Sequence, residues 1–138
     1  MTRRRIATNA APAAIGPYSQ GIAAGEFVFC AGQVGLDPTS GELVEGGIGR
    51  EAERALDNLR AVLEAAAMTM ADVVKTTVFL ADFSDFAALN EVYGRYFPDP
   101  PPARSTFQVA ALPKGARVEI EAIAHRARPV DAVAQGVR

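Results

Sequence analysis

The 138-residue chain has one cysteine, one histidine and no tryptophan. A single cysteine excludes a disulfide within the chain and is typical of proteins from a reducing compartment. One histidine and one cysteine leave no cluster of zinc-site spacing, and they argue against the common hydrolytic triads. We therefore expect Cys30 to be a small core residue and His125 to lie at a strand end.

Strong net charge and long apolar runs are also missing. The net charge of −2 and the pI near 5.4 give no general attraction to nucleic acid or anionic membranes. The basic run Arg3 to Arg5 is short, and we expect it to be solvated. No segment approaches the roughly 20 apolar residues that span a bilayer, and Asn9 and Pro12 interrupt any signal-peptide core. We predict a cytoplasmic protein.

The remaining composition is that of one globular domain, with 49% apolar and 22% charged residues. The pattern predicts the element order β-β-β-α-β-α-β-β, which is an α+β fold. Beyond Arg126 the sequence has no hydrophobic period. We predict a single domain over residues 1–126 and a flexible tail over residues 127–138.

Two segments have the spacing of amphipathic helices. The first is predicted over residues 50–68, where apolar residues recur at three- and four-residue steps. The second is predicted to begin after an N-cap at Ser84 and to end before Pro98. Its apolar stripe consists of Phe86, Leu89, Tyr93 and either Tyr96 or Phe97.

Two helices can cover only one face of a sheet of this size. Yet the segments 27–30 and 73–74 are apolar on both faces, as in strands that are buried on both sides. A sheet with an uncovered apolar face needs a second layer. We therefore expect the chain to self-associate through this open face, in a closed symmetric assembly.

Residues 103–124 read as two strands around a turn. In the second strand, Glu119 and Glu121 fall on the face opposite the apolar residues. They either face water or line a site. Arg104 heads the first strand, with Thr106 on the same face. Arg104 either binds a ligand carboxylate through two hydrogen bonds or forms a structural ion pair with Glu119 or Glu121, and the residues alone leave both open.

Three further residues have both a structural and a functional interpretation. Asn90 lies within the apolar stripe of the second helix, where its amide needs partners if it is buried and needs none if it is exposed. Tyr18 follows a Gly-Pro turn that does not require an aromatic ring, so the ring is a candidate pocket wall. Gly32 ends a strand, where glycine allows either a bend or close approach of a ligand.

Several motifs in order resemble the RidA (YjgF-type) family of reactive-intermediate deaminases, over roughly residues 5–126. The motifs are Gly-Pro-Tyr-Ser-Gln (16–20), Ala-Gly-Gln (31–33), Ala-Leu-Asp-Asn-Leu (55–59), Asp-Val-Val-Lys-Thr-Thr-Val-Phe-Leu (72–80), Asn-Glu-Val-Tyr (90–93), Ala-Arg-Ser-Thr (103–106), Leu-Pro-Lys (112–114) and Val-Glu-Ile-Glu-Ala-Ile-Ala (118–124).

The resemblance implies a chorismate-mutase-like protomer, with a mixed sheet and two helices on one face. It implies a homotrimer whose active sites lie between subunits. The implied reaction is the hydrolysis of enamines and imines, such as 2-aminoacrylate and 2-iminopropionate, to 2-keto acids and ammonia. The family needs no metal or organic cofactor, and no nucleic-acid or membrane partner is expected.

The resemblance also assigns roles to residues. Arg104 matches the arginine that binds the substrate carboxylate, and the backbone of Gly32 helps to hold the same group. Glu119 matches the acidic residue that positions the attacking water. The other implied pocket residues are Tyr18, Asn90 and Thr106.

The chain departs from the family pattern at two places. Thr106 stands where many members have cysteine, which is not the implied nucleophile. The proline-rich connector before Arg104 is shorter than in typical bacterial members. Other functions compatible with the pattern are a deaminase for 3-aminoacrylate, a non-catalytic small-molecule-binding or chaperone-like trimer, and the ribonuclease activity attributed to some relatives. The lack of a broad basic patch argues against RNA.

Overall fold

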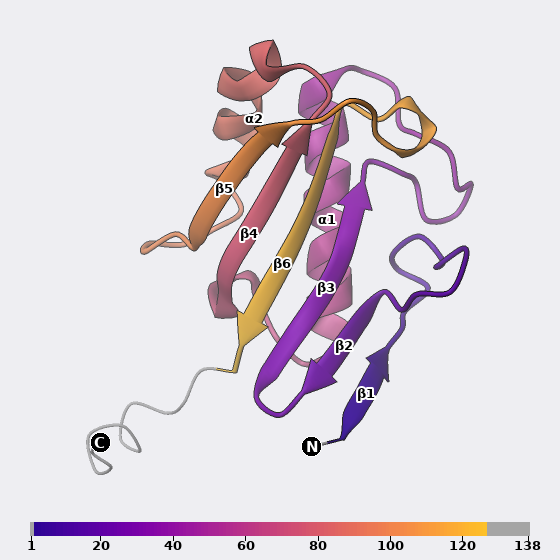
Figure 1. Ribbon diagram of the computed structural model, residues 1–138, viewed down its shortest axis with the longest axis vertical. Helices are drawn as coiled ribbons and strands as arrows, with labels where there is room; N and C mark the ends of the chain where they lie inside the picture. The colour runs from indigo at the N-terminus through magenta and orange to yellow at the C-terminus, as the bar shows by residue number, and fades with distance from the viewer. Residues whose placement is uncertain (1, 127–138) are drawn as a thin grey trace.

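Residues 2–126, which the computed structural model describes, form a six-stranded sheet with two α-helices on one of its faces (Figure 1). The strand order is β1-β2-β3-β6-β4-β5. Neighbouring strands are antiparallel except β4 and β5, which are parallel, so the sheet is mixed. The strands are β1 (Arg3–Ile6), β2 (Gly21–Ala24), β3 (Phe27–Val34), β4 (Val73–Leu80), β5 (Ala103–Gln108) and β6 (Val118–His125). The predicted α+β fold is confirmed, and the predicted tail over residues 127–138 lies outside the described residues.

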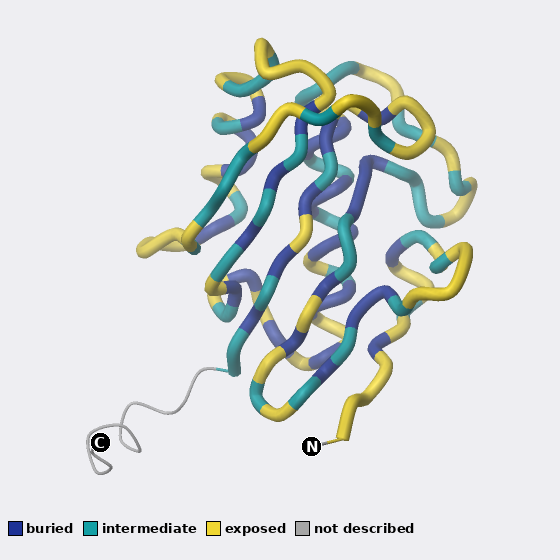
Figure 2. Tube along the Cα trace, viewed as in Figure 1, coloured by how far each residue is buried: buried dark blue, intermediate teal, exposed yellow. Residues whose placement is uncertain are grey.

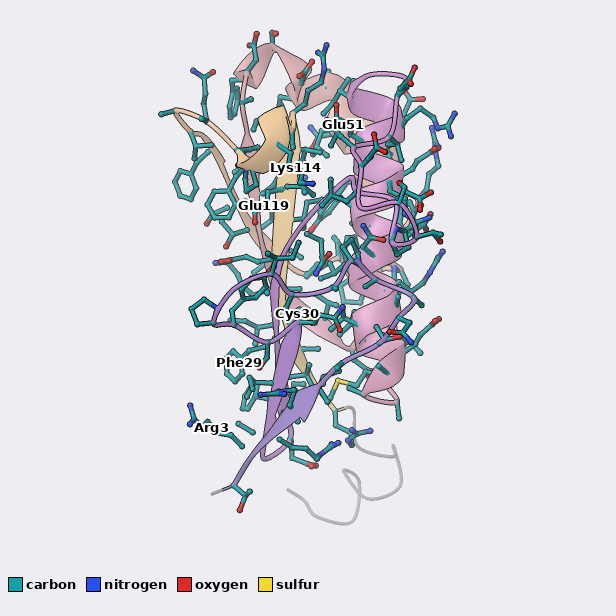
Figure 3. The ribbon with its side chains drawn as sticks, turned by 90° about the vertical axis from the view of Figure 1, so that its right-hand side faces the viewer. Arg3, Phe29, Cys30, Glu51, Lys114 and Glu119 are labelled. Atoms are coloured by element: carbon teal, nitrogen blue, oxygen red, sulfur yellow. The ribbon has the colours of Figure 1, made fainter. Side chains whose placement is uncertain are left out.

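The helices α1 (Ile48–Ala65) and α2 (Phe86–Tyr93) lie on the same side of the sheet (Figures 1 and 3). Leu56, Leu59 and Leu63 of α1 are fully buried against the sheet. Val78 and Ile120 meet them from the strands and are also fully buried. This single core confirms the prediction that both helices cover one face.

The first helix ends earlier than its apolar spacing predicted. The prediction over residues 50–68 extends three residues past the observed end at Ala65. Ala67 adopts a left-handed conformation with φ of 60°, and the Met68 amide donates back to the Leu63 carbonyl at 2.9 Å. This is a Schellman-type C-terminus with alanine where glycine is usual, so the sequence carries no stop signal there.

The start of the second helix was also predicted wrongly. Ser84 does not cap it, because the Asp82 carboxylate accepts a hydrogen bond from the Ser84 amide at 2.9 Å. This caps a one-turn 3-10 helix, Phe83–Asp85, that leads directly into α2. The helix ends at Tyr93, so the predicted stripe residue Phe97 packs from the segment that follows.

The face of the sheet opposite the helices carries large apolar side chains. Phe27, Phe29, Val74 and Phe107 are between 42% and 53% exposed. Figure 3 shows Phe29 on the side of the sheet away from α1. The predicted open apolar face is therefore present in the described part of the chain. No helix in residues 2–126 is both long and apolar enough to cross a membrane.

The last strand alternates as predicted. Val118, Ile120, Ala122 and Ala124 are buried against the helices, whereas Glu119 is half-buried and Glu121 is exposed (Figure 2). His125 ends this strand, and its ring meets Phe27 edge-on with centroids 4.7 Å apart. Cys30 is buried, as predicted for a small core residue. Because their side chains alternate with the buried residues of this strand, Glu119 and Glu121 both lie on the open face.

Candidate active site

Glu119 lies on the open face and folds back over β3. A Cβ atom built on Gly32 would lie 2.8 Å from Glu119 Cδ, closer than real Cβ contacts allow. Only glycine at position 32 lets the carboxyl group take this position. Within residues 2–126 no hydrogen bond or ion pair is made by the Glu119 carboxylate. Burial raises the pKa of Glu119, and the nearby Glu121 charge raises it further.

A β-bulge places Gly32 beside this carboxyl group. Cys30 pairs with Ala122 and Gln33 with Ile120, so two residues of β3 oppose the single Glu121 of β6. Such bulges bend a strand and change the direction of nearby side chains, and they are common next to active sites. The bulge thus opens the sheet surface where Glu119 lies.

A cavity of about 670 Å³ lies over this region. Tyr18, Gly32 and Glu119, three of the predicted site residues, all line it. Lys114 lies at its rim, where its Nζ atom donates to the Gly41 carbonyl at 2.9 Å and joins two loops. Glu121 also lines the cavity. The cavity therefore brings together three of the predicted site residues, a group that we call the Glu119 half-site (Tyr18, Gly32 and Glu119).

Arg104 lies elsewhere, against α2. Its Cζ atom is 4.8 Å from the centre of the Tyr93 ring and 5.5 Å from that of Phe86. The side chain is half-buried, and within the described chain its guanidinium makes no ion pair or hydrogen bond. The aromatic rings stabilise the cation while its N–H donors stay uncommitted.

Asn90 lies on the same face of α2 as these two rings, four residues from Phe86 and three from Tyr93. Its Oδ1 atom is buried and, in the part of the chain that the structure describes, has no hydrogen-bond partner. Such groups are rare in folded proteins and call for a ligand, a water or another subunit. The alternative of an exposed Asn90 amide is therefore wrong. Thr106 is half-buried on the helix side of β5 and completes this second group, the Arg104 half-site (Asn90, Arg104 and Thr106).

The two half-sites are on opposite faces of one sheet. Arg104 pairs with Thr76, which is fully buried on the helix side. Glu119 pairs with Phe79, whose neighbours along β4 point toward the helices, so Glu119 faces away from them. The ion pair of Arg104 with Glu119 or Glu121 is therefore wrong for a single chain. A ligand that contacts both half-sites must lie between two chains.

Phe86 and Tyr93 were not predicted as site residues. The sequence placed them on the apolar stripe of the second helix, and that stripe position is typical of core residues. Their contact with Arg104 depends on how α2 crosses β5, which no local pattern reveals. Within residues 2–126, no group of three or more histidine, cysteine, aspartate or glutamate side chains is arranged to hold a metal ion.

A family model described as Endoribonuclease L-PSP matches residues 8–126. The chain belongs to the endoribonuclease L-PSP family. Among curated relatives, the mouse (Mus musculus) protein named 2-iminobutanoate/2-iminopropanoate deaminase is 57% identical over 122 residues, which cover 88% of this chain and 90% of the relative.

Solved structures of similar proteins agree with this fold. RidA from the Antarctic bacterium Psychrobacter sp. is 49% identical, with a TM-score of 0.86 over 88% of this chain and 98% of that one. E. coli TdcF, crystallised with bound serine, is 43% identical, with a TM-score of 0.86 over 90% of this chain and 99% of that one. The resemblance to the RidA family is confirmed.

Proposed function

We propose that the protein hydrolyses 2-imino acids such as 2-iminopropionate and 2-iminobutyrate to 2-keto acids and ammonia. It is an enzyme, a deaminase of the RidA type, and its substrates are small imines that bear a carboxylate. The observation that carries this proposal is the 57% identity to a deaminase of this specificity over nearly the whole of both chains. The single cysteine supports a cytoplasmic location.

The proposed assembly is a homotrimer with its active sites between subunits. The open sheet face with Phe27, Phe29, Val74 and Phe107 supplies the apolar surface that such an assembly needs. Arg104 and Glu119 lie on opposite faces of the sheet, and neither has an oppositely charged partner among residues 2–126. The arrangement is explained if the Arg104 half-site of one protomer meets the Glu119 half-site of its partner.

The chemistry at such a site is simple. The Arg104 guanidinium binds the substrate carboxylate through two parallel hydrogen bonds. The imine carbon is electrophilic, and more so when the nitrogen is protonated. Glu119 orients a water molecule and accepts one of its protons as the oxygen bonds to that carbon. Protonated Glu119 returns this proton to the carbinolamine nitrogen, the C–N bond breaks with its electron pair going to nitrogen, and the hydroxyl proton passes to the Glu119 carboxylate as the carbonyl forms and ammonia leaves.

This reaction needs orientation, one water and proton transfers. An enamine such as 2-aminoacrylate enters after protonation at its terminal carbon, which gives 2-iminopropionate. Residue 106 takes no part in these bond changes, so threonine in place of cysteine is compatible with turnover. Asn90 and Tyr18 line the two half-sites and shape the pocket around the substrate.

A coupled assay tests the proposal. A pyridoxal-phosphate-dependent dehydratase generates 2-aminoacrylate, and keto-acid release is followed with and without this protein. The wild type should accelerate release, and Arg104→Ala should abolish the acceleration. Arg60→Ala is a matched control, because Arg60 also lies over an aromatic ring, that of Tyr96, and belongs to neither half-site. Full activity in Arg104→Ala would refute the carboxylate-binding role.

Two comparisons separate the alternatives. If the protein only binds small molecules, the Glu119→Ala variant and the wild type should bind pyruvate equally well, and neither should show turnover. A deaminase for 3-aminoacrylate would release its aldehyde product faster than pyruvate in a substrate panel. The proposed function predicts instead that Glu119→Ala keeps pyruvate binding and loses turnover, and that 2-imino acids are the faster substrates.

A further inference from the structure

Arg104 keeps its position without an anionic partner among residues 2–126. Its long side chain has several rotatable bonds, and ordering such a side chain costs conformational entropy. In the described chain its contacts of known geometry are the rings of Tyr93 and Phe86, with Tyr93 the nearer at 4.8 Å. The rings therefore supply the order that an ion pair would otherwise provide.

Tyr93 is itself held firmly. Its ring is buried and packs on Phe97, with centroids 4.5 Å apart. Its hydroxyl shares a buried hydrogen bond of 2.6 Å with the hydroxyl of Thr76. Thr76 is fully buried, and it is the residue of β4 that pairs with Arg104 of β5. The strand pair that carries the arginine thus also fixes the ring beneath it.

A cation held over aromatic faces keeps its hydrogen-bond donors free. An ion pair with a carboxylate of the chain would occupy the same N–H groups that a substrate carboxylate needs. A ring stabilises the charge through its π-electrons and accepts no strong hydrogen bond from those groups. The aromatic contact therefore orders Arg104 and leaves it available.

We propose that Tyr93, locked by its hydrogen bond to Thr76, is a positioning residue that holds the Arg104 guanidinium ready for the substrate carboxylate. The proposal rests on the deaminase function proposed above, and it adds a residue that sets affinity for the acid end of the substrate. Tyr93 does not touch the reacting atoms, so it acts on substrate binding and only weakly on the chemical step.

The test combines direct binding with kinetics on the full-length protein. Pyruvate, the product of 2-iminopropionate hydrolysis, is titrated by calorimetry, and kcat and KM are measured in the coupled assay. Tyr93→Leu should weaken pyruvate binding about tenfold and raise KM similarly, as expected for the loss of a partly desolvated cation–π contact. Its kcat should stay within about threefold of wild type, because the water-activating residue is unchanged.

Conservative variants keep the test valid if Tyr93→Leu folds poorly. Tyr93→Phe retains the ring and Thr76→Val retains the volume of the threonine, and each loses only the hydrogen bond. Each should weaken pyruvate binding about two- to threefold. Tyr96→Leu is the matched control, because Tyr96 contacts Arg60 and hydrogen-bonds to Asp57, away from both half-sites. It should lower the melting temperature without changing pyruvate affinity.

A double-mutant cycle decides whether Tyr93 works through the arginine. In an Arg104→Met background, the substitution Tyr93→Leu should cause no further loss of pyruvate binding. Equal losses in both backgrounds, or wild-type affinity in the three single variants at Tyr93 and Thr76, would overturn the proposal. A wild-type protein without deaminase activity would instead refute the proposed function, so the two failures are distinguishable.

Discussion

The carboxyl group of Glu119 lies directly over the backbone of Gly32, so close that a methyl group at position 32 would come within 2.8 Å of Glu119 Cδ. The two residues belong to adjacent strands, β6 and β3, and meet where the bulge in β3 interrupts the pairing. Glu119 can therefore adopt this conformation only if the residue at position 32 has no side chain.

Gly32→Ala should therefore disable the enzyme without unfolding it. Gly32 does not have a left-handed φ, so alanine is compatible with its backbone, and the flexible Glu119 side chain moves away at small cost. We expect the deaminase rate to fall at least about tenfold, because the carboxylate proposed to position the attacking water is displaced. Assay and thermal melting measure the two effects.

Gly49→Ala provides the control for this substitution. Gly49 lies in the first turn of α1, and a Cβ added there would meet no atom within 4 Å. Alanine at this position should leave the rate unchanged and stabilise the protein slightly, because alanine favours helix. A Gly32→Ala enzyme as active as Gly49→Ala would contradict the importance of the Gly32–Glu119 contact.

Glu119 should also set the pH dependence of activity and stability. Burial and the Glu121 charge raise its pKa, so the carboxylate becomes protonated, and the rate falls, at a higher pH than for an ordinary glutamate. A raised pKa means that the folded state binds this proton more tightly than the unfolded state. Its contribution to stability is full below the unfolded pKa and is lost as the pH rises through the folded pKa.

Glu119→Gln should accordingly be inactive yet more heat-stable than wild type at neutral pH, where the wild type keeps a partly buried charge.

Glu121→Gln should stay folded and shift the acidic limb of the rate profile to lower pH, because the repulsion between the carboxylates is removed. Melting curves and rate profiles across pH 4 to 8 measure both. An unchanged acidic limb in Glu121→Gln would show that the two carboxylates are not coupled.

The sequence predicted the layers of this fold well, and it predicted three residues that the structure brings together at one cavity, Tyr18, Gly32 and Glu119. Alternation along residues 118–124 was enough to place Glu119 on the face away from the helices. It could not show that Arg104 points to the other face, because that depends on the parallel pairing of β5 with β4. The contact of Arg104 with the rings of Phe86 and Tyr93 could not be predicted either, because residues of the core and residues of a pocket can share one apolar stripe on a helix.

Buried polar side chains were the other limit of the sequence. Glu51 reads as part of the charged face of the first helix, yet it is buried, and its carboxylate accepts a hydrogen bond from the Arg117 amide at 2.8 Å. This contact spans 66 residues of chain, and no local pattern reports it.

Cys30 should be chemically inert in the folded enzyme. Burial raises the pKa of its thiol to about 12, so almost no reactive thiolate exists at neutral pH. The sequence has no other cysteine, and residue 106 is threonine. Treatment with iodoacetamide should leave the deaminase rate unchanged and add no mass to the native protein. Alkylation should appear only after denaturation, and rapid inactivation of the native enzyme would contradict a core position for Cys30.

Subunit complementation tests most directly whether Arg104 and Glu119 act together from two chains. Arg104→Ala and Glu119→Ala should each be inactive when assembled alone. Equal amounts of the two, unfolded together and reassembled at random, should form sites in which both residues are intact. Each residue is intact in half of the chains, so about a quarter of the wild-type rate should return. A mixture that stays inactive, while wild type treated in the same way regains its activity, would contradict active sites shared between subunits.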